Sequence, residues 1–414
     1  MKIKKIVASL FAVGVMAAPL AHATDGYFSH GYGMKAKGMG GAGIALPQDS
    51  LAAATNPAGM VMVGDRIDLG IDWFKPTRGS DIVGNGAGLN GTYSGNGTNN
   101  FFIPEFGYNK MMNPDMSLGV SVYGNGGMNT DYTSSPFAAF GGTSPAGVNL
   151  EQLFIAPTWA MKLNSNNSIG VSLNLAYQSF EAKGLQPFAI MSSAPTLLTN
   201  NGKDSSTGYG LRLGWTGQVT PTVTLGATYQ TKTKMGKLSK YAGLFAEQGG
   251  FDIPANYGVG IAAKLSDTTT VAADIEQIQY SGVPSVANSG ANPGLLGANN
   301  GAGFGWRDMT VFKLGVSHQY DSGLVIRAGY NGGRQPIPET ETFFNILAPG
   351  VVQDHLTLGA TWTMPSKSEL TLGYMHAFKK TINGVNSIPA GMGGGNANLN
   401  MYEDSLGIAY GWKM

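Results

Sequence analysis

Few residues of this sequence have the types and spacing that catalysis requires. Beyond residue 23 the histidines are His30, His318, His355 and His376. No two of them have the close spacing of metal ligands, and neither the GxSxG hydrolase motif nor the HExxH zinc motif occurs. The run from Gly38 to Gly43 fits the dinucleotide fingerprint by letter, but no strand precedes it. We therefore predict no catalytic residue, no metal site and no cofactor.

Three basic residues suggest binding chemistry instead. Arg212, Lys313 and Arg327 each lie in an alternating segment, on the face opposite its apolar residues, so in a barrel they should point into the lumen. An Arg or Lys in a low-dielectric cavity holds a carboxylate well. These residues are therefore candidates for lumenal carboxylate binding. The alternative is that they pair with acidic residues of the wall, such as Asp68, Asp72, Asp274 or Glu276.

The N-terminus and the composition indicate export to a membrane. Three lysines precede the apolar run 6–20, and a small-x-small triplet follows at 21–23, so we predict a signal peptide over residues 1–23. The sequence has no cysteine, which excludes disulfides as the source of stability. Only 12% of the residues are charged, against about 25% in soluble proteins. A net charge of +1 gives no support for a nucleic-acid partner. This composition is typical of an outer-membrane β-barrel.

Segments of alternating apolar and polar residues recur along the chain. A period of two predicts strands with one apolar face. Together with three weaker segments they give fourteen predicted strands, at 67–73, 101–111, 116–125, 150–162, 169–178, 209–215, 223–229, 257–261, 271–275, 312–316, 324–330, 356–362, 370–374 and 406–412. Tryptophans near strand ends fit the aromatic girdles of a membrane barrel; they are Trp73, Trp159, Trp215, Trp306, Trp362 and Trp412.

The connections alternate between short turns and long polar loops. Seven long loops are predicted, near 76–100, 126–149, 181–205, 236–252, 281–305, 333–351 and 380–400. Short turns at one end and long loops at the other are typical of bacterial outer-membrane barrels. Fourteen strands enclose a lumen too wide for strand side chains to fill. The non-alternating stretch before the first strand is therefore predicted to fill it, with a short helix at 49–55.

We thus predict an all-β membrane fold, a 14-stranded antiparallel transmembrane β-barrel with an N-terminal hatch of short helices inside the lumen. Its parts are a signal peptide at 1–23, the hatch at 24–63 and the barrel at 64–414. Several motifs then resemble the FadL-type family of outer-membrane transporters of long-chain fatty acids and aromatic hydrocarbons. Asn56, Pro57 and Ala58 match the NPA motif of its hatch, following the glycine-rich run 37–43. Segments 183–186, 241–245 and 251–255 resemble its third and fourth outer loops, and 306–308 the start of its tenth strand.

The resemblance implies a path for a hydrophobic solute. Such transporters capture the solute between outer loops, pass it to an internal site and release it sideways through a kink in the third strand. The kink is expected at Gly124, Gly126 and Gly127, because glycine within a strand favours bulges. Asn56 is expected to anchor the hatch, and the glycines at 38–43 to move. The expected capture groove consists of Leu185, Phe188, Ile190, Met191, Tyr241, Leu244, Phe245 and Phe251.

The predicted function is outer-membrane transport of hydrophobic compounds, either long-chain fatty acids or hydrocarbons. The alternatives are a diffusion porin for polar solutes and a surface adhesin or barrel hydrolase. We expect a monomer in the outer membrane of a Gram-negative bacterium, crossing it many times. Its partners would be a hydrophobic small molecule, outer-membrane lipid with lipopolysaccharide, and the outer-membrane assembly machinery, with no nucleic acid.

Overall fold

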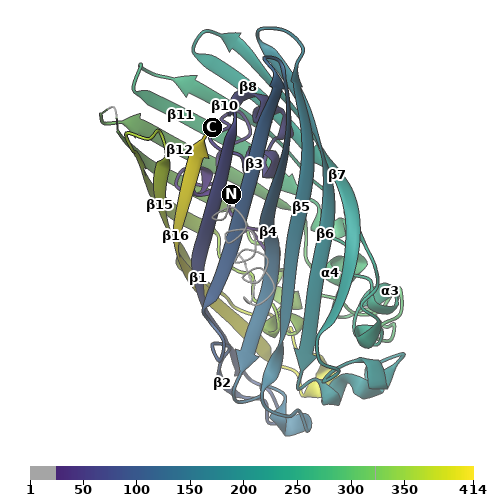
Figure 1. Cartoon of the computed structure of the whole chain (residues 1–414). Helices are drawn as coiled ribbons and strands as arrows, with labels where there is room; N and C mark the ends of the chain where they lie inside the picture. Colours follow the sequence, from purple (N-terminus) through teal and green to yellow (C-terminus); the bar gives the residue numbers. More distant parts are fainter. Residues whose placement is uncertain (1–24, 322) are drawn as a thin grey trace, which may run out of the picture.

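Fourteen long strands form a closed barrel (Figure 1). The computed structural model describes residues 25–321 and 323–414, so the predicted signal peptide lies outside the described residues. Sequence neighbours pair antiparallel, and the last strand returns to the first from Arg66↔Lys413 to Val83↔Asn396. The strands are β1 (Arg66–Val83), β3 (Phe101–Asn113), β4 (Met116–Tyr132), β5 (Ala146–Lys162), β6 (Asn167–Lys183), β7 (Asp204–Thr220), β8 (Val223–Gln230), β10 (Asn256–Lys264), β11 (Thr269–Ile278), β12 (Met309–Gln319), β13 (Leu324–Gly333), β14 (Asp354–Thr363), β15 (Glu369–Ile382) and β16 (Asn396–Lys413). The predicted fold class and all fourteen strands are confirmed.

The wall presents apolar side chains outward, as the alternation predicts. On β7, Tyr209, Leu211 and Leu213 are 65, 42 and 44% exposed, whereas Gly210 and Arg212 between them are buried. Such a continuous outward apolar band fits contact with lipid. Among the described residues, no helix is long and apolar enough to cross a membrane.

The two ends of the barrel differ in the length of their connections. At the short-turn end two-residue turns such as 114–115 and 221–222 join the strands. At the long-loop end the chain adds β2 (Gly91–Ser94) and β9 (Lys234–Met235) to β1 and β7. The long loops also carry single helical turns: η3 (Ala138–Phe140), η4 (Gln186–Met191), η5 (Pro195–Leu197), η6 (Ser239–Tyr241), α3 (Ala246–Gly249), η7 (Tyr280–Gly282), α4 (Pro284–Ala287), η8 (Glu339–Glu341), η9 (Phe344–Ile346) and η10 (Ala390–Met392).

Two expectations about the wall were wrong. Strands β1 and β16 run on to Val83 and from Asn396, into the regions predicted as loops 76–100 and 380–400. Backbone pairing continues there, but the apolar residues of β16 change faces: Ala397, Leu399 and Met401 are buried, whereas Leu406 and Ile408 are exposed. The outward apolar pattern therefore ends before the strand does. Trp306 does not belong to an outer girdle, because it is 2% exposed and stacks on Tyr27 at 5.9 Å inside the barrel.

Residues 25–63, here called the hatch, lie within the barrel, and its short helices are at the end opposite α3 and β2 (Figure 1). They comprise α2 (Met34–Lys37), η1 (Ala52–Ala54) and η2 (Pro57–Met62). The helix predicted at 49–55 is only the single turn η1, because the Leu51 N–H donates to Asp49 Oδ1 (3.0 Å) and forms a turn first. Pro57 then opens η2 at the position where proline is favoured.

Glycines on the inner face of the wall make the seat of the hatch. A Cβ on Gly170 would lie 2.3 Å from the carbonyl carbon of Pro57, and one on Gly214 1.9 Å from Asn56 Oδ1. The same close approach, under 3.0 Å to a hatch atom, occurs at Gly107, Gly119, Gly226, Gly260, Gly315, Gly329 and Gly407. The barrel wall is therefore shaped to take the hatch backbone at contact distance.

A bulky side chain at one of these glycines tests whether they position the hatch. Gly170→Val should displace η2 and weaken hatch packing by about 1–3 kcal/mol, the usual cost of overpacking. Gly391→Val is the matched control, because no atom lies within 4 Å of a Cβ there. The expected result is raised conductance in planar bilayers for Gly170→Val alone, with both barrels still folded. Wild-type conductance in folded Gly170→Val would contradict this account of the seat.

Candidate transport path

The wall is open between β3 and β4. The two strands pair from Asn113↔Met116 only as far as Phe106↔Val122. Beyond that point, among the described strands, β3 pairs only with β1, and β4 pairs only with β5. At the far end of the gap the Gly97 N–H donates to the Asp131 carbonyl of β4 (2.9 Å). Pro104 lies on the β3 side of this β3–β4 gap and has no N–H to donate to a neighbouring strand.

The predicted kink glycines lie on the other side of the gap. The register of β4 against β5 shifts between Gly124 and Gly126, which is a β-bulge. The N-terminal segment, Asp25–Ser29, occupies the freed edge of β4 from inside the barrel. The Ser29 N–H donates to the Asn125 carbonyl (3.1 Å), and the Gly127 N–H donates to the Tyr27 carbonyl (3.0 Å). A Cβ on Gly126 would lie 1.8 Å from that Tyr27 oxygen, so only glycine fits.

The other side of the N-terminal segment packs on the long loops. Tyr27 is fully buried against Tyr280 and Phe251, at ring distances of 5.3 and 6.1 Å. Asn331 Nδ2 donates to Asp25 Oδ2 (3.2 Å), and Lys313 Nζ is 3.9 Å from the same oxygen. Burial raises the pKa of Asp25 to about 7, opposed by the charge of Lys313. The segment thus connects the gap to the loops through aromatic contacts and to β12 and β13 through polar ones.

The predicted capture residues separate into three groups. Leu185, Phe188 and Leu244 line a loop pocket completed by Phe137, Leu296, Phe343, Phe344 and Leu347. Its free space is about 10 Å³, room for no more than one water. Tyr241, Phe245 and Phe251 are buried behind it, while Ile190 and Met191 are 90% and 43% exposed at the surface. The loop pocket is lined wholly by apolar residues and is nearly closed.

A chain of aromatic rings connects the loop pocket to the gap. Phe245 follows Leu244 of the pocket and contacts Phe251 edge to face, with ring centroids 4.8 Å apart. Phe251 in turn contacts Tyr27, whose carbonyl binds β4. An apolar route therefore leads from the loops to the N-terminal segment.

The three predicted lumenal cations are engaged within the protein. Arg212 donates to Gln230 Oε1 (2.6 Å) and to the Thr55 carbonyl of the hatch (3.0 Å). Lys313 Nζ donates to Glu276 Oε2 (2.8 Å). Arg327 donates to Gln48 Oε1 of the hatch (2.9 Å) and to Thr361 Oγ1 (2.7 Å). Carboxylate binding by these residues stays a prediction, and their contacts favour structural pairing.

Asn56 of the NPA motif joins two parts of the hatch to the wall. Its Nδ2 donates to the Ile44 carbonyl (2.7 Å) and to the Trp215 carbonyl of β7 (3.0 Å), and its Oδ1 accepts from the Ala58 N–H (3.1 Å). The glycine run 38–43, by contrast with the expectation, is tightly packed. A Cβ on Gly40 would lie 2.5 Å from the Tyr330 carbonyl oxygen. We therefore expect this run to stay seated and the N-terminal segment to move.

Ion pairs also hold α2 in place. Lys37 Nζ is 2.8 Å from Asp72 Oδ2, and Lys35 Nζ is 2.6 Å from Glu369 Oε2, all with buried side chains. Separating such pairs would leave buried charges unpaired, which costs several kcal/mol.

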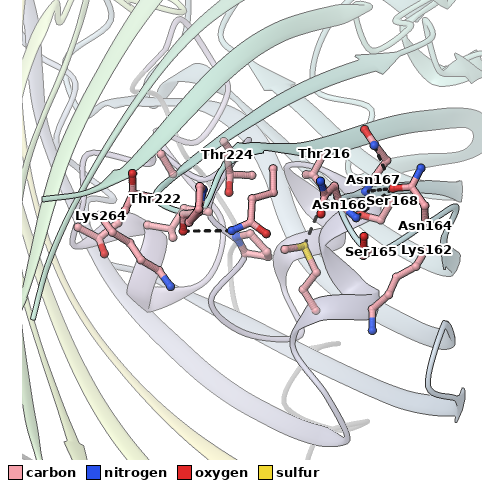
Figure 2. Close-up of a pocket in the computed structure, with 18 residues that line it drawn as sticks. Lys162, Asn164, Ser165, Asn166, Asn167, Ser168, Thr216, Thr222, Thr224 and Lys264 are labelled. Atoms are coloured by element: carbon pink, nitrogen blue, oxygen red, sulfur yellow. Dashed lines mark hydrogen bonds between the residues drawn. The ribbon is translucent and has the colours of Figure 1, made fainter. Parts of the chain in front are cut away.

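The cavity at the short-turn end has a different character. Its volume is about 360 Å³. Figure 2 shows polar side chains of the turn 164–167, Thr216, Lys162 and Lys264 along its border. Hatch residues Ala45–Pro47 and Met62 also line it. This mouth therefore combines hydroxyl, amide and ammonium groups with apolar residues of the hatch.

Comparison with known proteins identifies the family. The family model described as outer membrane protein transport protein (OMPP1/FadL/TodX) matches residues 20–410. The chain belongs to the FadL/TodX family of outer-membrane transport proteins. Among curated proteins, none matches this chain significantly.

Solved structures of the FadL/TodX type share the fold. The Pseudomonas putida toluene transporter TodX is 19% identical with a TM-score of 0.71, covering 94% of this chain and 100% of its own. A Pseudomonas aeruginosa FadL homologue is 16% identical with a TM-score of 0.72, over 94% and 99%. The Ralstonia pickettii toluene transporter TbuX is 19% identical with a TM-score of 0.66, over 93% and 99%.

Two features of this FadL/TodX member were missed by sequence reasoning. One is the pairing of the N-terminal segment with β4, for which the aromatic residues Tyr27 and Phe28 were the available signal. The other is the glycine seat, which the recurrence of glycine on the inward face of successive strands could have revealed. Predicting either feature requires knowing which segments that are distant in sequence lie in contact.

The pairing at Gly126 generates a direct test. Gly126→Ala should displace Tyr27 and break the two backbone hydrogen bonds, each worth about 0.5–1.5 kcal/mol. Amide hydrogen exchange at Ser29 should then accelerate about tenfold or more. Gly282→Ala is the control, because no atom lies within 4 Å of a Cβ there. Unchanged protection of Ser29 in Gly126→Ala would refute the pairing.

Proposed function

We propose that this protein carries small, neutral, apolar solutes across the outer membrane. The solute is taken up at the loop pocket, follows the aromatic rings inward and leaves sideways through the β3–β4 gap when the N-terminal segment withdraws. In this proposal residues 24–63 act as the hatch and residues 64–414 as the barrel. The observation that carries it is the occupation of the gap by Tyr27–Ser29, held by two backbone hydrogen bonds.

The residues along the two possible exits, axial at the short-turn end and lateral at the β3–β4 gap, favour the lateral exit. Axial passage would take an apolar solute past the buried ion pairs of α2 and past Lys162 and Lys264 at the short-turn end. The gap instead faces lipid, into which such a solute partitions favourably. A diffusion porin is disfavoured by the same hatch, which the glycine seat fits at contact distance.

Two observations favour a neutral solute over a fatty acid. All eight residues that line the loop pocket are Phe or Leu, so a carboxylate would be desolvated there without a partner. Arg212, Lys313 and Arg327 already bind groups of the hatch or wall. The structural relatives named for toluene and monoaromatic hydrocarbons agree with this choice.

Movement of the N-terminal segment can be blocked chemically. The chain has no cysteine, so Asp25→Cys with Asn331→Cys gives one defined pair, at side chains that are 3.2 Å apart. A short thiol cross-linker applied to the folded protein should abolish uptake of a labelled monoaromatic into proteoliposomes. The uncross-linked double variant and the two treated single variants serve as controls and should transport alike. Full uptake after complete cross-linking would contradict gating by this segment.

Competition measures the substrate class. An unlabelled monoaromatic should suppress uptake of the labelled one, and an alkane of similar size should do so at least in part. A long-chain fatty acid at the same free concentration should not, because nothing in the loop pocket compensates its carboxylate. Competition by the fatty acid alone would reverse the assignment of class while leaving the lateral route in place.

A further inference from the structure

A groove on the outside of the barrel is unrelated to the transport path. It has a volume of about 590 Å³ and crosses β5, β6 and β7. Its apolar lining includes Ile155, Leu175, Tyr177, Tyr209 and Met235. The side chains of Ile155, Leu175, Tyr177 and Tyr209 point to the membrane side, and Tyr177 and Tyr209 are 47% and 65% exposed. Met235 lies on the opposite face of β9 and packs against the interior core. We call this feature the wall groove.

Strand β9 creates the groove. After Gln230 the chain detaches from its regular register, and Lys234 and Met235 return to pair with Tyr209 and Gly208 of β7. Met235 Sδ lies 2.3 Å from the position of a Cβ on Gly208, so the glycine lets the methionine lie close against the wall. Ile155, Leu175, Tyr209 and Lys234 are successive cross-strand partners in one row. The outward side chains therefore change, across neighbouring strands, from the apolar Ile155 and Leu175, here called the apolar floor, to Lys234.

The lysine at the end of this row has no acidic partner among the described residues. Its neighbours do have partners, because Lys232 Nζ is 3.5 Å from Asp252 Oδ2 and Lys203 Nζ is 3.6 Å from Glu151 Oε1. Residues 203–240 contain five lysines and a single acidic residue, Asp204. Among the described residues that line the groove, Lys234 alone is charged.

The height of Lys234 on the wall matches a lipid headgroup. Along β7 the outward residues change from Leu213, Leu211 and Tyr209 to Thr207 and Ser205 toward the long loops. This change marks the boundary between hydrocarbon and polar layers. Lys234 lies opposite Tyr209, at that boundary, and the apolar floor extends from it across β6 to β5.

We propose that the wall groove binds a phosphorylated lipid of the leaflet on the long-loop side. Its acyl chains lie along Ile155, Leu175 and Tyr177, and its phosphate pairs with Lys234. Tyr209 supplies an apolar ring with a polar tip at the interface. A neutral transported solute would leave the lysine unused, and a free phosphate ion would leave the apolar floor unused, so the lipid fits the chemistry best.

Binding of a diphosphorylated lipid A to the detergent-purified, folded protein tests the proposal by native mass spectrometry. Lys234→Gln should weaken binding about fivefold, the effect expected for one basic residue near an anionic headgroup. Leu175→Ser should also weaken it, by removing part of the floor. Lys232→Gln is the matched control, because that lysine is paired with Asp252 and does not line the groove.

Each arm has a definite outcome. Loss in Lys234→Gln and Leu175→Ser, with retention in Lys232→Gln and weaker binding of the dephosphorylated lipid, supports the proposal. Equal loss in both lysine variants would show only general attraction of charge and overturn it. Displacement of the lipid by inorganic phosphate at equal concentration would overturn it as well, by making the apolar floor irrelevant. Heat-modifiable migration on gels confirms that each variant is folded.

Discussion

The structure depends on one constraint, that backbone N–H and C=O groups within a membrane wall need partners. A closed barrel satisfies it everywhere except at a break. Here β3 and β4 separate after Phe106↔Val122, and β4 is left with an unpaired edge. Tyr27 and Ser29 of the N-terminal segment supply the missing partners from inside the lumen. The N-terminal segment therefore completes the backbone hydrogen bonding of β4 at the β3–β4 gap.

The two parts of the hatch are held by different kinds of contact. Residues 33–63 rest on the glycine seat and are fixed by Asn56, by the two lysine ion pairs and by Asp274, which accepts the Gly43 and Ile44 N–H groups (2.7 and 3.0 Å). The N-terminal segment makes two hydrogen bonds to β4, accepts a hydrogen bond from Asn331 at Asp25, donates the Tyr27 N–H to Tyr280 Oη (3.2 Å), and contacts the rings of the loops. In the proposed mechanism, a solute that enters among those loop aromatics competes with Tyr27 for its packing, and this competition would couple capture to opening.

The strands of the barrel could be predicted from the sequence, whereas the β3–β4 gap and the contacts of the N-terminal segment could not. The alternation of apolar residues located the fourteen barrel strands but not the short strands β2 and β9, because lipid contact imposes that pattern on each barrel strand separately. The bulge at Gly124–Gly126 was expected from glycine in a strand. The loss of β3–β4 pairing could not be predicted, because register depends on two strands at once. Trp306 and the lumenal cations were misjudged or left open for a similar reason, since their partners come from distant loops and from the hatch.

The central claim, lateral exit at the β3–β4 gap, is tested most directly by labelling the route. A neutral monoaromatic probe carrying a diazirine is photolysed during uptake into proteoliposomes, and the modified peptides are mapped. The account predicts adducts on the loop pocket, on residues 25–29 and on the edge of β4 near Val122–Gly127. Adducts on Ala45–Pro47, Met62 and the mouth at the short-turn end, with none along the gap, would contradict it.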